Sequence, residues 1–464
     1  MSKIAELQKK YPNIPQEVIV KWDVLGSGVR DTEGLDRVSN WARDGGFGTY
    51  QSYDHDVSLQ DLVKKNPLRA KQGYILTPGE FYMRHGTGVR IQRDTASPYE
   101  IKELDSGGFG LFEGSEKVDV DIFFVPPKPM PEEPRTSKGT LASTLLDVRR
   151  QNCFTIAPVR HCEYFNRGEQ CKFCNYNATQ EDARSVGGLR PAAITLEETT
   201  EAYKIVSSTV RFIEGRFQMG AISDSEQEAK VLLNFVENIA KGAPHKPVLN
   251  LVIQPANRKV LQRLKDAGLD CLSLCMEVWD PKLFPEVCPG KAKYRGRDRY
   301  LETGQDAVDV FGVGNVCCNF VPGVTLMPEN GHKTWQEARD SHVEGNTWMI
   351  KNGVFPTFLN LRLTYGSVYG NDSSNREKLP PTDYYLDVAQ AHHEAMLEYG
   401  LYPKLNKLMS CGFCCSPRVY NGDIGALQLA GDLGTWMADS VPPEQNWLAE
   451  FVSTVSVQKV EDTK

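Results

Sequence analysis

The chain has 464 residues, of which 40% are hydrophobic and 24% charged, so we expect a globular protein too long for one ordinary core. Its formal net charge is −7 and no block of basic residues stands out, which argues against nucleic acid as a partner. There is no run of about 18 apolar residues for a membrane span and no apolar signal-peptide core, so we expect a cytoplasmic protein whose 12 cysteines are thiols or metal ligands.

Residues 1–125 are predicted to form an N-terminal accessory region of α+β type. A helix is expected at 14–22, and short strands are expected at 74–79, 89–92 and 118–125. No residue of this region carries an evident chemistry. Whether it covers the mouth of a catalytic domain or mediates dimer contacts stays open.

The proline-rich residues 126–139 are predicted to be an extended linker. Residues 140–370 alternate strands and helices, the pattern of βα units that build a parallel sheet. Residues 371–464 are expected to form a helical C-terminal extension. Strands are expected at 154–159, 209–215, 248–255, 269–277, 314–321 and 354–362, and helices at 195–207, 225–241, 258–267, 300–311 and 332–352. Six βα units are fewer than the eight of a closed barrel.

Three cysteines, Cys162, Cys171 and Cys174, follow the first predicted strand at C-x8-C-x2-C spacing. A structural zinc site needs four protein ligands, whereas soft thiolates also suit iron–sulfur clusters. A cubane held by three cysteines leaves one iron free to bind another molecule. Two other interpretations remain open: a zinc site completed by His161 or a distant ligand, and ordinary buried thiols.

This loop resembles the cluster loop of the radical S-adenosylmethionine (SAM) enzymes, whose usual motif is C-x3-C-x-aromatic-C. Phe173 occupies the aromatic position, and Cys171 and Cys174 have the usual final spacing, but the first gap is eight residues instead of three. The resemblance covers residues 150–370. It implies an α/β fold with a partial (β/α)6 TIM-type barrel, a [4Fe–4S] cluster, bound SAM, and an electron donor such as flavodoxin or ferredoxin.

The resemblance also implies residues that bind SAM. A strand end after strand two holds the methionyl amine with backbone carbonyls, and the matching residues here are Gln218, Met219, Gly220 and Ala221. The family usually has two adjacent glycines there, so a plain turn is the alternative. Asn319 and Val321, at the end of strand five, match the region that the family packs against adenine.

Glu277 ends strand four, on the face where α/β folds carry their chemistry. The sequence after it resembles that of biotin synthase-type relatives, in which a carboxylate and a downstream basic residue orient SAM. Arg295, Arg297 and Arg299 are the candidate basic residues, because a guanidinium binds a carboxylate in two places. The alternative is a solvated basic turn balanced by neighbouring acidic residues.

A second cysteine cluster, Cys411, Cys414 and Cys415, lies near the C-terminus. It is one ligand short of a four-ligand site unless another cysteine, such as Cys153 or Cys288, joins it. A second iron–sulfur cluster and a set of structural thiols therefore remain alternatives.

Together these features predict a radical SAM enzyme that cleaves SAM reductively and abstracts hydrogen from a small polar substrate. The second hypothesis is an iron–sulfur enzyme that transfers a methyl or aminocarboxypropyl group from SAM. A zinc-stabilised binding protein without activity is the third. The sequence indicates neither the substrate, nor a catalytic residue, nor the oligomeric state.

Overall fold

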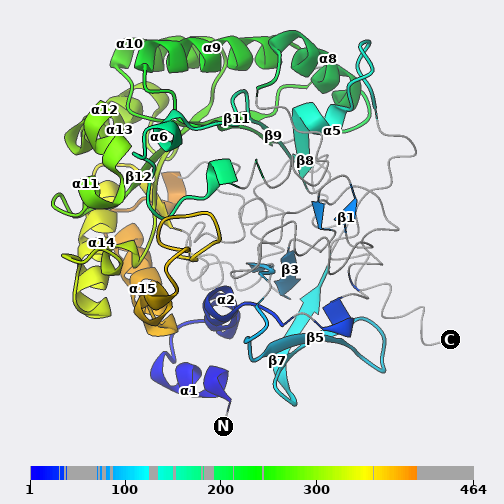
Figure 1. Cartoon of the computed structure of the whole chain (residues 1–464), viewed down its shortest axis with the longest axis vertical. Coiled ribbons are helices and arrows are strands. Elements are labelled where there is room, and N and C mark those ends of the chain that lie inside the picture. The colour runs from blue at the N-terminus through cyan, green and yellow to red at the C-terminus, as the bar shows by residue number, and fades with distance from the viewer. Residues whose placement is uncertain are drawn as a thin grey trace.

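The computed structural model describes residues 2–30, 32–35, 38, 70–71, 74–75, 80–83, 87–92, 94–124, 134–149, 153–178, 181, 193–212, 214–242, 245–358 and 360–404. Its main feature is a seven-stranded sheet with strand order β14-β13-β12-β11-β10-β9-β8. A five-stranded antiparallel sheet is built from the N-terminal region. Figure 1 shows the two sheets and the helices around them.

Six strands of the large sheet run parallel and neighbour one another in chain order. They are β9 (Cys153–Ile156), β10 (Glu214–Phe217), β11 (Val248–Ile253), β12 (Cys271–Glu277), β13 (Val316–Phe320) and β14 (Phe355–Phe358). Helices connect successive strands, so the predicted α/β fold with six βα units is confirmed. The structure adds β8 (Leu146–Arg149), an antiparallel edge strand beside β9 that the sequence did not reveal.

The connecting helices lie where the sequence predicted them. They are α8 (Leu196–Ser207), α9 (Ser225–Gly242), α10 (Arg258–Asp266), α13 (Arg297–Phe311) and α14 (Trp335–Lys351). In Figure 1, α8, α9 and α10 run along the outer side of the strands. Every residue of β9, β10, β13 and β14 is buried, because helices and sheet neighbours cover both faces of a parallel sheet.

The second strand is displaced from its predicted position. The prediction was 209–215, whereas β10 is Glu214–Phe217. The amides of Thr209 and Val210 both donate to the carbonyl of Val206, so these residues complete the last turn of α8. Their β-branched side chains suggested a strand, but the hydrogen bonds of the helix end outweigh that preference.

The N-terminal region contains two helices, α1 (Lys3–Lys10) and α2 (Gln16–Ser27), and a short strand pair, β1 (Ala70–Lys71) and β2 (Tyr74–Ile75). Its antiparallel sheet consists of β3 (Glu80–Met83), β4 (Gly88–Arg90), β5 (Tyr99–Glu103), β6 (Phe109–Glu113) and β7 (Glu116–Phe123).

Helix α2 is buried almost all round. Its Trp22 stacks on Phe358 of β14 at 5.4 Å and on Tyr385 of α15 (Thr382–Glu398) at 5.1 Å. The two regions therefore share one hydrophobic core.

Two predicted features lie outside the described residues: the cluster of Cys411, Cys414 and Cys415, and most of the proline-rich linker. Within the described part of the chain, none of the helices has the length and hydrophobicity that crossing a membrane requires.

Candidate active site

The three-cysteine loop begins where β9 ends, at the carboxyl edge of the parallel sheet. Cys162 immediately precedes the short helix α6 (Glu163–Asn166), and the amide of Cys174 donates to the carbonyl of Cys171 at 2.9 Å. Asn177 fastens the loop to itself. Its side-chain oxygen accepts from the amide of Cys162 at 2.8 Å, and its nitrogen donates to the carbonyl of the same residue at 3.2 Å. A single buried amide therefore holds the start of the loop against its end.

The predicted segment Gln218–Ala221 runs directly beside this loop. The amide of Gln218 donates to a backbone carbonyl at the end of β9 at 3.0 Å, and the amide of Gly220 donates to a backbone carbonyl just after that strand at 2.9 Å. The carbonyl of Ala221 accepts from the amide of Glu163 at 3.0 Å. A Cβ atom at Gly220 would lie 2.1 Å from the carbonyl oxygen of His161. Only glycine allows this close approach.

Two short helices after β12, α11 (Phe284–Val287) and α12 (Pro289–Tyr294), hold the loop from another side. The amide of Lys172 donates to the end of α11 at 2.9 Å, and the amide of Gly290 donates to the carbonyl of Glu169 at 2.8 Å. Between the helices, the buried thiol of Cys288 is hydrogen-bonded to the sulfur of Cys171. The structure thus places Cys288 beside the first cysteine cluster, a neighbour that sequence separation concealed.

Glu277 and Lys291 form a buried ion pair next to this loop. Lys291 Nζ lies 2.7 Å from Glu277 Oε1, and the two side chains are only 10% and 13% exposed. The ammonium group also donates to the carbonyl of Cys275. Burial is the largest influence and lowers the pKa of Lys291, but Glu277, Tyr300 and the neighbouring thiols Cys171 and Cys275 together outweigh it, so the net effect is a raised pKa.

The backbone at Glu277 is unusual. With φ of 72°, Glu277 is the one non-glycine residue with positive φ in the described part of the chain. The pairing of β12 with β13 shifts register between Cys275 and Glu277, and the amide of Val321 donates to the carbonyl of Glu277 at 2.9 Å. Such a conformation costs of order 1–3 kcal/mol and is found where the surroundings hold a functional side chain in place.

The thiols of the loop interact electrostatically with one another. Burial is the main cause that raises the pKa of Cys162 and of Cys174, and the neighbouring thiols raise both further. The hydrogen bond from Cys288 is the main cause that lowers the pKa of Cys171. Each of the three residues is partly exposed as a whole, so the enclosure of the sulfur atom rather than the exposure of the residue sets these shifts.

The donor set suits a soft, thiolate-bound iron–sulfur centre. Three neighbouring thiols on one loop supply the ligands that such clusters take. The fully buried hydroxyl of Tyr300, whose ring lies 5.9 Å from Lys291 Nζ, has no hydrogen-bond partner among the described residues. Over the same residues, no three His, Cys, Asp or Glu side chains are grouped closely enough to hold a single metal ion.

The three candidate arginines have different surroundings. Arg295 is buried, donates to the carbonyls of residues 222 and 223 at 2.8 Å each, and pairs with Glu228 at 3.4 Å. Arg297 lies 4.6 Å from the ring of Trp279 and donates to the carbonyl of that residue at 2.8 Å. Arg299 is exposed and pairs with its helix neighbour Glu302. Arg299 therefore matches the solvated-turn alternative.

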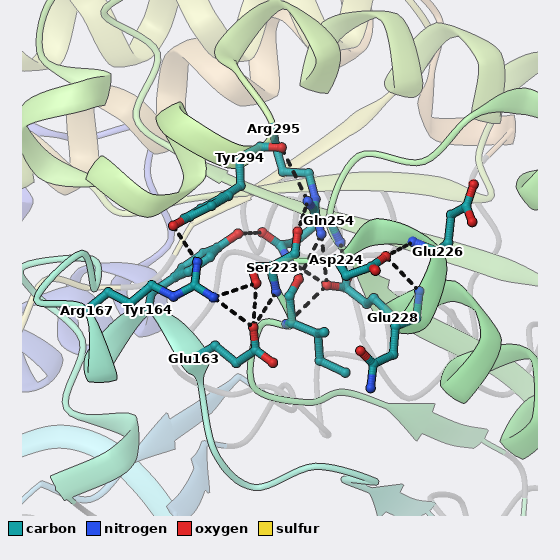
Figure 2. Close-up of polar contacts among 12 residues, drawn as sticks. Glu163, Tyr164, Arg167, Ser223, Asp224, Glu226, Glu228, Gln254, Tyr294 and Arg295 are labelled. Atoms are coloured by element: carbon teal, nitrogen blue, oxygen red, sulfur yellow. Dashed lines mark hydrogen bonds and ion pairs between the residues drawn. The ribbon is translucent and has the colours of Figure 1, made fainter.

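A buried polar network connects the cysteine loop to the neighbouring βα units (Figure 2). The hydroxyl of Tyr164 donates to Gln254 at 2.7 Å, and the side-chain nitrogen of Gln254 donates to Glu228 at 2.6 Å. The Tyr164 ring stacks on Tyr294 at 5.4 Å. Burial is the main cause that raises the pKa of Glu228, and Arg295 partly offsets it. No local sequence signal joins these residues, because they come from separate elements.

The last candidates lie at the end of β13. The side-chain nitrogen of Asn319 donates to the carbonyl of Leu274 at 3.1 Å and to the sulfur of Cys275 at 3.0 Å, and Thr357 donates to its oxygen. The Asn319 amide is thus engaged within the sheet, whereas the backbone of Val321 contacts Glu277.

No known family model matches the chain. The chain is 24% identical, over an alignment of 280 residues, to the curated bacteriochlorophyllide c C-7(1)-hydroxylase of Chlorobaculum limnaeum. The match covers 57% of this chain and 65% of that protein, less than two thirds. Among solved structures it is similar to methylornithine synthase (PylB; 16% identity, TM-score 0.37, covering 52% of this chain and 61% of that one). It is also similar to coproporphyrinogen III oxidase (HemN) of Escherichia coli, a radical SAM enzyme (12% identity, TM-score 0.34, covering 56% and 55%). At these TM-scores the structural likeness carries no argument of its own.

Proposed function

We propose that this chain is a radical SAM enzyme that holds a [4Fe–4S] cluster on Cys162, Cys171 and Cys174 and uses it to act on a small polar substrate. The observation that carries the proposal is the position of the three thiols. They lie on the loop that leaves β9 at the carboxyl edge of the parallel sheet, where α/β folds bind ligands.

A cluster held by these three thiols would supply one electron for the reductive cleavage of SAM, the chemistry that hydrogen abstraction from the substrate requires. The chain's own groups would bind and orient SAM. The backbone of residues 218–221 lies against the cysteine loop, and its carbonyl oxygens would hold the SAM ammonium group. The Glu277 carboxylate, held by Lys291, offers further acceptor sites to an ammonium or ribose group. A flavodoxin or ferredoxin would deliver the electron.

The test begins with iron, sulfide and zinc content after purification without oxygen. We expect about four irons per chain, lost in Cys171→Ala and retained in the control Cys318→Ala, whose thiol is buried in β13. About eight irons per chain would bring the C-terminal cysteines in as ligands of a second cluster. Zinc without iron, in cells supplied with iron, would refute the proposal and favour the binding-protein reading.

The SAM product then identifies the reaction. 5′-Deoxyadenosine supports hydrogen abstraction, whereas methylthioadenosine or S-adenosylhomocysteine would show aminocarboxypropyl or methyl transfer. With a deuterated substrate, hydrogen abstraction predicts deuterium in the 5′-deoxyadenosine.

A second candidate substrate comes from the curated relative, which is named for hydroxylating a bacteriochlorophyllide. The identity of 24% favours a chlorophyllide-like macrocycle as the alternative to a small polar molecule. The two candidates are separated by comparing which of them increases formation of 5′-deoxyadenosine over the level without substrate.

A further inference from the structure

Lys291 is a buried cation fixed beside the three-cysteine loop. Its ammonium group is held by the Glu277 carboxylate at 2.7 Å and by the carbonyl of Cys275. Lysine side chains ordinarily extend their charge into water, and full burial is rare without a partner. Lys293, two residues further along the same helix, is 59% exposed and pairs with Glu169.

The backbone holds this cation in place relative to the loop. Helix α12 carries Lys291, and its Gly290 donates to the carbonyl of Glu169. A Cβ atom at Gly290 would lie 2.6 Å from both the Glu169 oxygen and the Tyr164 ring, so the two segments are in direct contact. On the same side, Cys288 is hydrogen-bonded to Cys171. These contacts hold the backbone of α12 against the loop, and the ion pair with Glu277 holds the ammonium group at the end of the side chain.

The charges of the ion pair act on the thiols of the loop. Lys291 favours the thiolate form at Cys171 and Cys162, and Glu277 opposes it at Cys171 and Cys174. Charges in a buried site are weakly screened by salt and water, so removing the lysine should be felt at the loop.

We propose that Lys291 is a positioning residue, a fixed buried cation that makes the iron–sulfur cluster on this loop easier to reduce. The inference rests on the proposed function, because it requires the cluster. Three thiolates give the bound cluster a net negative charge, and reduction adds one more electron. A nearby cation stabilises the reduced state more than the oxidised state, so its loss should disfavour reduction.

The experiment measures the reduction potential of the cluster without SAM, by titration under an inert atmosphere followed by electron paramagnetic resonance. Wild type is compared with Lys291→Met, with the charge-retaining Lys291→Arg, and with the control Lys293→Met, which removes an exposed charge from the same helix. Leaving SAM out separates an effect on the cluster from an effect on SAM binding. Iron and sulfide are counted in each variant first.

For Lys291→Met we expect the ratio of reduced to oxidised cluster at a fixed potential to fall about tenfold. This corresponds to a shift of the cluster's reduction potential by about 59 mV to a more negative value. This corresponds to a unit charge acting over roughly 12 Å at an effective dielectric constant of about 20. Lys291→Arg and Lys293→Met should stay within about twofold of wild type.

A Lys291→Met variant that keeps its iron and its wild-type potential would overturn the inference. Equal shifts in Lys291→Met and Lys293→Met would also overturn it, because an exposed charge should be screened. If Lys291→Met fails to fold, the reduction potential is measured in the double variant Lys291→Met/Glu277→Gln instead, because this variant buries no unpaired charge. It should shift the potential in the same direction by less, and no shift would refute the inference. Wild type without iron would instead refute the proposed function.

Discussion

Replacing Gly220 with alanine should damage the cysteine loop more than any other single methyl group added to this site. The new Cβ would lie 2.1 Å from the carbonyl oxygen of His161, 2.4 Å from its carbonyl carbon and 2.7 Å from the amide nitrogen of Cys162. All three are backbone atoms, so no side-chain rotation relieves the contact. Reaching 3.0 Å, the shortest separation that real Cβ atoms show, requires a movement of 0.9 Å (3.0 minus 2.1).

The cost can be worked from two parts. Overpacking a tight site costs about 1–3 kcal/mol. The hydrogen bond from the Gly220 amide to the exit of β9, 2.9 Å long, contributes about 1 kcal/mol and would be strained or lost. We therefore expect Gly220→Ala to lower the free energy of unfolding by about 2–4 kcal/mol, a large share of the 5–15 kcal/mol typical of a domain. Because the movement displaces Cys162, the variant should also lose iron.

The assay is denaturant unfolding of the protein without its cluster, together with iron content after reconstitution. Gly26→Ala is the matched control. A Cβ there meets nothing within 4 Å, and Gly26 lies within helix α2, so alanine should be neutral or stabilising by up to about 1 kcal/mol. If Gly220→Ala bound a full complement of iron and unfolded within about 0.5 kcal/mol of wild type, a level usual for surface substitutions, the reasoning would be wrong.

Two further predictions concern the groups that hold the loop. Asn177→Ala removes both hydrogen bonds to Cys162 and should cost about 1–3 kcal/mol and reduce iron retention, and a variant with wild-type iron content and stability would contradict this. Burial raises the pKa of Glu228 above 4.5 in the folded chain, so the native state holds its proton more tightly than the unfolded state. The free energy of unfolding of wild type, measured against Glu228→Gln by denaturant titration, should therefore fall as the pH rises through and above 4.5, and a constant difference would refute the assignment.

The repeating architecture was predictable because it depends on local patterns. Strands such as β11 and β13 are largely buried and appear as mostly apolar runs, and α10 between two of the strands is amphipathic. Cysteine spacing likewise predicted the loop, since residues 162–174 are too close in sequence to lie far apart. Two differences from the prediction in the large sheet have local causes. Residues 209–210 finish a helix rather than begin a strand, and β8 is a four-residue edge strand with little pattern to detect.

The surroundings of the loop depended on tertiary structure alone. Lys291 and Lys293 are the same residue type on the same short helix, yet one is buried against Glu277 and the other extends into solvent. Arg295 is directed into the core by Glu228, which lies 67 residues away in the sequence. Such differences arise from where separate elements meet, and local periodicity carries no information about that. The sequence by itself therefore determined the βα repeat and the three thiols, whereas the packing of α12 against the loop decided which charges lie beside them.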